Sequence, residues 1–362
     1  MVKKILLLSC FLFSLFIAKG QQVSQQDKRG LKDYYRGFFP IGVAVSPGAL
    51  KVGDEAELIK KQFSSLTAEN VMKPQPIHPK EKEFNWGPAD QIVEFGMTNN
   101  MKVRGHTLCW HNQTPDWFFE GEDGKPAGKE VVLQRLKTHI EAVVGRYQGK
   151  VYAWDVVNEA IVDAPGETIY RNTNWYKIVG EEYVANAFEY AHAADPDALL
   201  FYNDYNTIFP GKRERIFQLV KGLLDKGVPI HGIGMQGHWS VTTPIAAELE
   251  NTITKFASLG LTVQLTELDI SIHDKGESRR ELTASDTTTF TAEKEQKQAD
   301  QYALIMEILR KNKKNISGVT FWNISDRHSW LDNFPVKGRK DYPLLFDQNL
   351  QPKKAYWRVV DF

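Results

Sequence analysis

The sequence has little cysteine, no excess of either charge, and no long apolar run beyond its first twenty residues. Its 362 residues include only Cys10 and Cys109, too few for a disulfide framework or a cysteine-rich zinc module. The 45 Lys and Arg residues balance 45 Asp and Glu residues, so the formal net charge is zero. Balanced charge gives no general attraction to nucleic acid or acidic membranes. We therefore predict no nucleic-acid partner and no membrane span.

Aromatic residues, in contrast, are abundant. They make up 12% of the chain and include nine tryptophans, more than a core of this size usually needs. The remaining composition, with 42% apolar and 25% charged residues, is that of a folded protein and excludes a mainly disordered or collagen-like chain. We therefore expect some of the tryptophans to do more than pack a core.

The first twenty residues have the pattern of a secretory signal peptide. Lys3 and Lys4 precede a largely apolar run over residues 5–18, and Ala18 and Gly20 are small residues suited to a cut before Gln21. The run of 14 residues is shorter than the roughly 20 that a spanning helix needs. The sequence predicts a signal peptide over residues 1–20 and a mature chain over residues 21–362.

Removal of this segment changes the charge and the thiol count. The mature chain has 42 basic and 45 acidic residues, a net charge of −3, and Cys109 as its only thiol. We expect an exported protein, either secreted or periplasmic, with no internal disulfide. Residues 8–10 resemble a lipid-attachment site, but the apolar run continues for eight residues past Cys10, so we do not favour a lipid anchor.

Eight short runs rich in β-branched and aromatic residues recur along the chain. Most are almost continuously apolar, as strands covered on both faces are. They span residues 39–45, 64–69, 102–109, 151–158, 199–204, 232–238, 262–269 and 318–324. Stretches with helical periodicity separate them, for example residues 131–147. This alternation predicts an α/β fold, a single (β/α)₈ TIM barrel.

A doubly wound open sheet is the alternative fold. It is disfavoured because no Gly-x-Gly-x-x-Gly motif or P-loop follows the first predicted strand. The polar, Thr-rich residues 275–297 are interpreted as a long loop.

In a (β/α)₈ barrel the active site forms at the carboxyl ends of the strands. Seven of the eight predicted strands end in or near polar or aromatic residues, and two of these residues are glutamates: Glu159 after the fourth strand and Glu267 on the seventh. Both lie in apolar runs, where a buried acid needs stabilising neighbours. Two opposed carboxyl groups are what glycoside hydrolysis requires. Asp155 and Asp269 are rival candidates, and Asp155 is interpreted as structural.

Two other chemistries are weaker hypotheses. His106, His111 and His238 would suit a three-histidine zinc site, but His106 and His111 do not have the spacing of a helical ligand pair. Cys109 has no evident activating partner in the sequence. We predict no metal and no cofactor.

The aromatic residues and the two glutamates suggest a sugar substrate, because apolar sugar faces stack on Trp rings. Trp110, Trp322 and Trp330 lie near strand ends, whereas Trp154, Trp175 and Trp357 are interpreted as packing residues; the former group is expected to touch sugar.

Together these segments resemble glycoside hydrolase family 10, whose members are mostly endo-β-1,4-xylanases. The matching motifs, in family order, are TAENVMK (67–73), RGHTLCWH (104–111), WDVVNEA (154–160), NDYN (203–206), GIGMQGH (232–238), TELDI (266–270) and TFW (320–322). The resemblance extends over roughly residues 35–362 and implies a retaining enzyme that cleaves xylan and xylo-oligosaccharides, built as one catalytic barrel over residues 21–362.

The resemblance also implies residue roles. Glu159 would be the acid/base and Glu267 the nucleophile, with His238 hydrogen-bonded to the nucleophile and Asp269 behind it. Asn158 would hold the 2-hydroxyl of the sugar being cleaved. The other implied sugar contacts are His106, Trp110 and Gln236 at the same sugar, Glu69, Asn70, Lys73 and Gln113 at the next sugar on the non-reducing side, Trp322 and Trp330 as an aromatic cover, and Tyr205 near the leaving group.

Three features depart from the family pattern: Asn323 stands where many relatives have Gly, Arg327-His328 follow Asp326, and residues 275–297 look specific to this chain.

A β-1,4-glucanase of the same fold and a non-catalytic glycan-binding relative remain alternatives. We expect a monomer.

Overall fold

The computed structural model describes residues 28–362 apart from residues 52, 122–123, 275, 277 and 287–288. The predicted signal peptide, residues 1–20, lies outside the described residues, and so does Cys10. Among the helices of the described part, none is long and apolar enough to cross a membrane.

Parallel strands close a barrel, as predicted. In spatial order they are β1 (Ile41–Val45), β2 (Ser65–Ala68), β3 (Lys102–Cys109), β4 (Val151–Asn158), β5 (Leu199–Asp204), β6 (Gly232–Met235), β8 (Thr262–Ser271) and β10 (Ile316–Phe321). The barrel closes because β10 pairs in parallel with both β1 and β8. These eight strands confirm the single (β/α)₈ barrel and exclude the open sheet.

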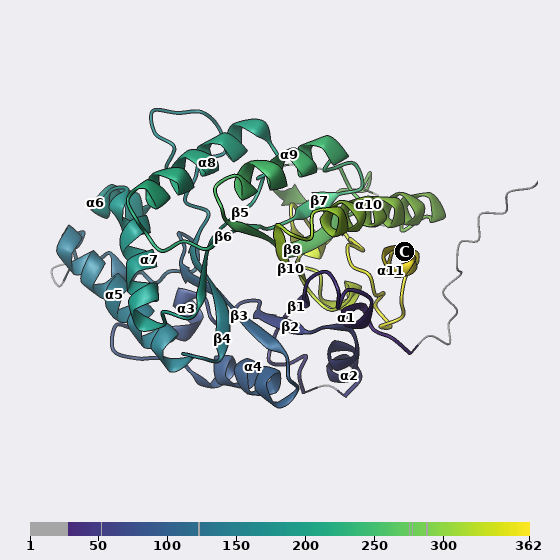
Figure 1. Ribbon diagram of the computed structural model, residues 1–362, viewed down its shortest axis with the longest axis horizontal. Helices are drawn as coiled ribbons and strands as arrows, with labels where there is room; N and C mark the ends of the chain where they lie inside the picture. Colours follow the sequence, from purple (N-terminus) through teal and green to yellow (C-terminus); the bar gives the residue numbers. More distant parts are fainter. Residues whose placement is uncertain (1–27, 52, 122–123, 275, 277, 287–288) are drawn as a thin grey trace, which may run out of the picture.

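Each barrel strand is followed by a helix on the outside of the barrel (Figure 1). The covering helices are α2 (Gly53–Gln62), α4 (Gly87–Thr98), α5 (Lys129–Arg146), α7 (Glu182–Ala194), α8 (Pro210–Asp225), α9 (Ala246–Ala257), α10 (Ala292–Lys311) and α11 (Lys354–Val360). Shorter helices are α1 (Leu31–Tyr34), α3 (Pro74–Ile77), α6 (Asn174–Val179) and the 3₁₀ turns η1 (Asp116–Phe118), η2 (Asp326–His328) and η3 (Trp330–Asn333). In α9, Leu249, Ile253 and Phe256 share one face and are buried, which is the amphipathic pattern of a barrel helix.

The predicted sixth strand differs from the observed one. Residues 232–238 do not form one strand, because the chain turns at Gly237, whose φ is 85°, a value that favours glycine. Beyond it, β7 (His238–Ser240) pairs in parallel with β8, with His238 opposite Asp269. The break brings the His238 side chain beside the end of β8.

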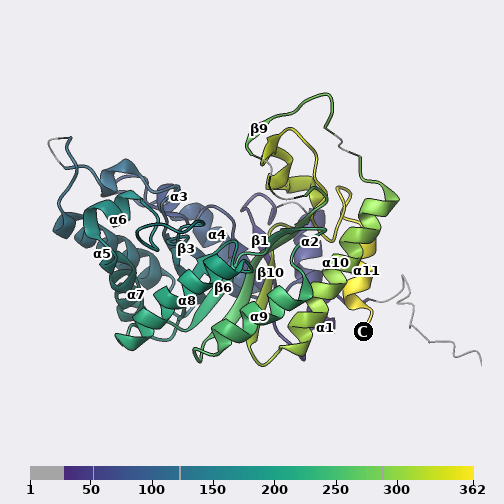
Figure 2. The ribbon, with the colours of Figure 1, turned by 90° about the horizontal axis from the view of Figure 1, so that it is seen from above.

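Residues 275–297 are not one loop either. Helix α10 begins at Ala292 and is capped by the Thr291 hydroxyl, which accepts the Lys294 N–H. Within the remaining segment, β9 (Arg280–Glu281) pairs with β11 (Val336–Lys337), which follows η3. Figure 2 shows β9 raised on one side of the barrel together with the segment after β10.

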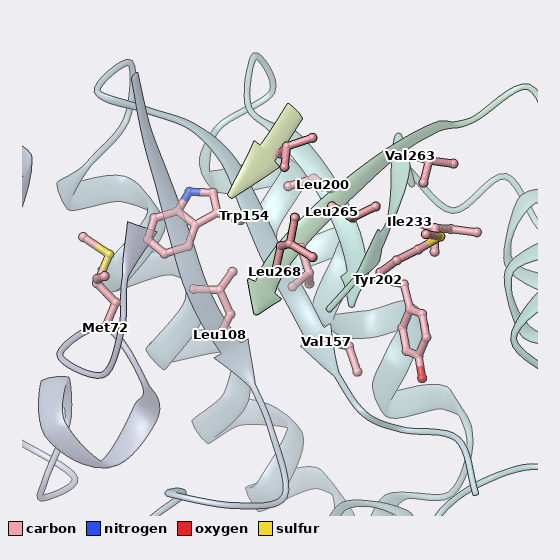
Figure 3. Close-up of a cluster of buried hydrophobic side chains, with 14 of the residues drawn as sticks. Met72, Leu108, Trp154, Val157, Leu200, Tyr202, Ile233, Val263, Leu265 and Leu268 are labelled. Atoms are coloured by element: carbon pink, nitrogen blue, oxygen red, sulfur yellow. The ribbon is translucent and has the colours of Figure 1, made fainter. Parts of the chain in front are cut away.

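The core lies between the strands and the helices. Figure 3 shows apolar side chains from neighbouring strands, among them Trp154, Leu200 and Leu265, packed together. Trp154 and Trp175 are fully buried, as predicted for packing residues, and Trp357 is half-buried against the core. The ring of Trp154 lies against Gly105, where an added Cβ would come within 2.0 Å of a ring carbon, so only glycine fits there.

Candidate active site

The predicted site residues converge at the carboxyl end of the barrel. Glu159 directly follows β4, and Glu267 lies within β8. The strand register places Asn158 opposite Asn203 of β5, and His238 opposite Asp269. Residues that are far apart in the sequence therefore meet at one rim.

Glu267 is almost fully buried, with 4% of its surface exposed, and both of its oxygens have partners. Oε1 accepts a hydrogen bond of 2.7 Å from the Asn203 side-chain amide. Oε2 lies 3.2 Å from Nε2 of His238. The other ring nitrogen of His238 lies 2.9 Å from Asp269 Oδ2. Asp269, His238 and Glu267 thus form one chain of contacts that ends at Glu267.

The charges of this chain favour an ionised Glu267. Burial by itself would raise the pKa of Glu267, but His106, His238 and Asn203 outweigh it and hold that pKa at about 2. Burial would likewise lower the pKa of His238, yet Asp269 and Glu267 raise it to about 9. At neutral pH the imidazolium of His238 therefore donates to both carboxylates.

Glu159 has neutral donors instead. Its Oε2 accepts a hydrogen bond of 3.0 Å from the Trp110 indole. Its Oε1 accepts from the side-chain amides of Gln236 at 2.8 Å and Asn158 at 3.3 Å. The backbone of Glu159 has a φ of 59°, and its N–H donates to the Asn203 carbonyl. The turn out of β4 aims this carboxylate toward the β3 and β6 ends.

A layer of side-chain amides connects the two glutamates. The Asn203 amide that donates to Glu267 also donates to Asn158 Oδ1 at 2.8 Å. Gln236 donates to the same Asn158 oxygen at 3.3 Å as well as to Glu159. Thr266 donates to Asn203 Oδ1 at 2.6 Å, which fixes how that amide is turned. The sequence prediction of site residues missed Asn203, although its position at the end of β5 marked it as a rim residue.

The predicted group Glu69, Asn70 and Lys73 also gathers at this rim. The Lys73 ammonium donates to Asn70 Oδ1 at 2.9 Å and lies 5.0 Å from the centre of the Trp110 ring. Burial lowers the pKa of Lys73, although Glu267, Glu69 and Glu159 act in the opposite direction. Burial likewise raises the pKa of Glu69, against the effect of Lys73. The group forms a polar wall beside the two glutamates, in which Lys73 is buried and Asn70 is exposed.

Asn323 joins this wall from the end of β10. Its φ of 133° lies in the region that favours glycine, which agrees with its standing where glycine was expected. The side chain compensates locally, because Oδ1 accepts the Ile324 N–H and Nδ2 donates to the His328 carbonyl. Nδ2 also reaches Glu69 Oε2 at 3.4 Å.

Two tryptophans border the Asp269–His238–Glu267 chain. Trp322 is 6% exposed and makes edge contacts with His106 and His238, at centroid distances of 5.4 Å and 6.1 Å. Trp330 in η3 makes an edge contact with His238 at 4.9 Å, and its indole N–H donates to Asp269 Oδ2 at 2.8 Å. Both rings therefore lie beside His238, the partner of Glu267, and their predicted contact with sugar stays a prediction.

Beneath the rim, the interior of the barrel contains a buried ion pair. Arg104 donates two hydrogen bonds to Asp155, and His106 Nδ1 lies 2.8 Å from Asp155 Oδ2. All three residues are at most 2% exposed. Asp155 thus supports His106 from below, which agrees with its interpretation as a structural residue.

On the β5 side, Tyr205 is held by charged neighbours. Its hydroxyl accepts from Arg171 at 2.7 Å and donates to Asp163 at 2.5 Å. Arg171 also donates to the backbone carbonyl of Glu159 at 3.1 Å, a link that the sequence prediction missed. Gln113 is exposed after β3, and within the described residues no hydrogen bond joins its side chain to the other site residues. Its predicted sugar contact stays a prediction.

The three histidines considered as zinc ligands do not come together as one set. His106 and His238 contact different carboxylates, and His111 lies beside Asn112 at 3.2 Å. Across the described part of the chain, no group of three or more His, Cys, Asp or Glu residues is arranged to hold a metal ion. Cys109 is buried, and burial raises the pKa of its thiol, which disfavours a nucleophilic role.

The barrel and the two rim carboxylates define a glycoside hydrolase of the (β/α)₈ class. The sequence profile of glycosyl hydrolase family 10 matches residues 30–362. The chain belongs to this family.

Individual relatives are similar over nearly the whole chain. A beta-1,4-xylanase of Dictyoglomus thermophilum is 50% identical over 359 residues, which are 99% of this chain and 97% of the relative. An endo-1,4-beta-xylanase of Geobacillus stearothermophilus is 47% identical over 331 residues, 91% of this chain and 98% of the relative. The crystal structure of a Paenibacillus barcinonensis xylanase complexed with a conduramine derivative has a TM-score of 0.88 at 47% identity, covering 93% of this chain and 99% of that one.

Proposed function

We propose that this protein is a retaining endo-β-1,4-xylanase with Glu267 as nucleophile and Glu159 as acid/base. The observation that carries the residue assignment is the difference between the two carboxylates. Glu267 is buried against a protonated imidazole and has a pKa of about 2, so it is ionised and ready to attack. Glu159 is held by neutral N–H donors and is the group suited to exchange a proton.

In the first step, a Glu267 oxygen attacks the anomeric carbon while Glu159 gives its proton to the departing glycosidic oxygen. The bond between sugar and leaving group breaks as the bond to Glu267 forms. Asn158 lies between the two glutamates and is placed to bond the 2-hydroxyl, a contact that strengthens as positive charge develops on the ring.

In the second step, Glu159 takes a proton from water, and the resulting nucleophile displaces Glu267 from the anomeric carbon. Two inversions give net retention. During this step Glu267 becomes a leaving group, and the imidazolium of His238 stabilises the carboxylate that is released.

The xylan chain is proposed to run along the polar wall and under the aromatic rings. Glu69, Asn70 and Lys73 offer charged and amide groups to sugar hydroxyls beyond the cleaved bond, and Trp110, Trp322 and Trp330 supply flat apolar faces. The net charge of −3 suits a neutral polysaccharide, whose binding needs no electrostatic steering.

The test is NMR analysis of the first product released from linear xylan. The β-anomer is expected first, and α-anomer first would contradict retention. Carboxymethylcellulose is the companion substrate: faster hydrolysis of it than of xylan would favour a β-1,4-glucanase. Absence of turnover on either substrate, with xylo-oligosaccharides still bound, would indicate a glycan-binding relative.

Export is a separate proposal. The basic start, the apolar run and the small residues before Gln21 support cleavage after Gly20 and release to a periplasm or to the outside. Sequencing the N-terminus of the exported protein should give Gln21 as the first residue, apart from cyclisation of that glutamine. A lipid-modified N-terminal Cys10 would contradict this. Gel filtration with light scattering is expected to show a monomer.

A further inference from the structure

An exposed arginine beside β9 contacts the aromatic residues at the rim. The guanidinium carbon of Arg279 lies 5.0 Å from the centre of the Phe334 ring. The Phe334 ring stacks with that of Trp330, with centroids 4.9 Å apart and planes inclined by 28°. Trp330 in turn contacts His238 and donates to Asp269. A continuous line of contacts therefore runs from a surface arginine to the partners of Glu267.

The backbone keeps Arg279 and Phe334 beside each other. Strands β9 and β11 pair with Arg280 opposite Val336, and the Arg280 N–H donates to the Pro335 carbonyl at 3.1 Å. Arg279 therefore lies one position before Arg280, and Phe334 lies two positions before Val336, the residue that pairs with Arg280.

The segment after β9 is fastened by a local ion pair. Asp286 accepts two hydrogen bonds from the Arg280 guanidinium, at 2.6 Å and 2.7 Å, and one from the Thr283 N–H at 2.8 Å. The base of η3 is fastened as well, because Asp332 accepts the Asp341 N–H at 2.9 Å. The segment after β9 and the η3 turn that carries Trp330 are thus each held by contacts that do not involve Arg279.

We propose that Arg279 is a positioning residue that orients Trp330 through Phe334, and so sets how tightly the sugar chain is held. This inference rests on the proposed xylanase function. A cation over an aromatic face restricts how that ring tilts, and at an exposed site the interaction is modest. Phe334 transmits the restriction because its ring is stacked on the indole. Segment 279–286, which the sequence alone marks only as polar, would then contribute to substrate affinity without touching the reacting atoms.

The first test compares Arg279→Ala with Lys337→Ala. Both remove an exposed cation, Arg279 next to β9 and Lys337 within β11, but Lys337 faces Glu281 at 3.4 Å instead of an aromatic ring. We expect Arg279→Ala to raise KM for xylo-oligosaccharides by about two- to fivefold, the size of an exposed cation–π contact, with kcat nearly unchanged. Lys337→Ala should leave both constants unchanged. Arg279→Lys should recover part of the lost affinity, and Arg279→Gln should not.

The second test asks whether the effect passes through Phe334. In a Phe334→Leu background, Arg279→Ala should no longer change KM, because the ring that couples arginine to Trp330 is gone. An unchanged KM for Arg279→Ala in the original protein, or an equal effect in both backgrounds, would overturn the proposal. Thermal unfolding of every variant checks that the fold is kept. Failure of the original protein to hydrolyse xylan would instead refute the proposed function, so the two failures are distinguishable.

Discussion

The surroundings of the two glutamates differ in the charge of their partners. Glu267 is buried beside a protonated histidine that a second carboxylate, Asp269, supports from behind. Glu159 accepts hydrogen bonds from an indole and two side-chain amides, and these three donors are neutral groups that do not titrate. The hydrogen-bond partners of Glu267 thus include a charged group, whereas those of Glu159 are all neutral.

This difference separates the two chemical tasks. A nucleophile has to stay ionised although it is buried, and nearby positive charges and hydrogen-bond donors to the carboxylate offset the penalty of burial. A group that alternately gives and takes a proton is better served by partners whose own charge does not change. Variants that remove or neutralise each set of partners therefore test the comparison directly.

Removal of the nucleophile is expected to have the largest effect. Glu267→Ala should lower kcat on xylan by about 10⁴-fold or more, because no other group is placed to attack. Calorimetric titration with xylohexaose should still show binding. The control is Glu307→Ala, which removes an exposed carboxylate from α10 and should leave kcat unchanged. Turnover that survives Glu267→Ala would refute the assignment.

Removal of the acid/base should be less severe and should depend on the leaving group. Glu159→Ala is expected to lower kcat/KM on xylan by roughly 10²- to 10⁴-fold. On an aryl xylobioside with a good leaving group, which needs no proton, the first step should continue and the covalent intermediate should accumulate as a burst. An equal loss on both substrates would argue that Glu159 has another role.

Neutralising His238 should make the environment of Glu267 resemble that of Glu159. His238→Asn keeps a donor but removes the charge, so the pKa of Glu267 should rise from about 2 toward the ordinary 4.5. Since the reaction needs ionised Glu267, the acid limb of kcat/KM against pH should move to higher pH by one to two units, an order-of-magnitude expectation for the loss of a close charge. Circular dichroism along the series separates this shift from acid unfolding. An unmoved acid limb would mean that His238 does not set the ionisation of Glu267.

Loss of one neutral donor to Glu159 should have the smallest effect. Trp110→Phe removes the N–H that reaches Oε2 but keeps a flat apolar ring, and a drop in kcat/KM of about tenfold is expected for one such hydrogen bond. The acid limb should stay in place, because Glu267 keeps its charged partner. A shifted acid limb in this variant would contradict the separation of the two environments.

The sequence predicted the barrel because its strands are apolar on both faces. Strand β4, for example, is buried almost throughout, and all of its residues except Asp155 and the terminal Asn158 are apolar or aromatic. The break between β6 and β7 was not predictable, because it depends on the backbone angle at Gly237 and on the pairing of β7 with β8.

The rim positions followed from strand ends, but the contacts among them did not. Asn203 bonds Glu267, 64 residues further along the chain, and only closure of the barrel brings these two residues together. Arg171 lies in the loop after β4 and reaches back to the Glu159 carbonyl, with no sequence motif that marks this contact. The roles assigned to individual residues remain predictions for the variants above to test.

The ion pair between Arg104 and Asp155 has a consequence for how this barrel can change. Replacing Asp155 alone leaves the Arg104 guanidinium buried without a carboxylate, which costs about 3–5 kcal/mol, and it also removes the partner of His106. A redesign of the barrel layer under His106 therefore has to change Arg104 and Asp155 together and give His106 a new partner.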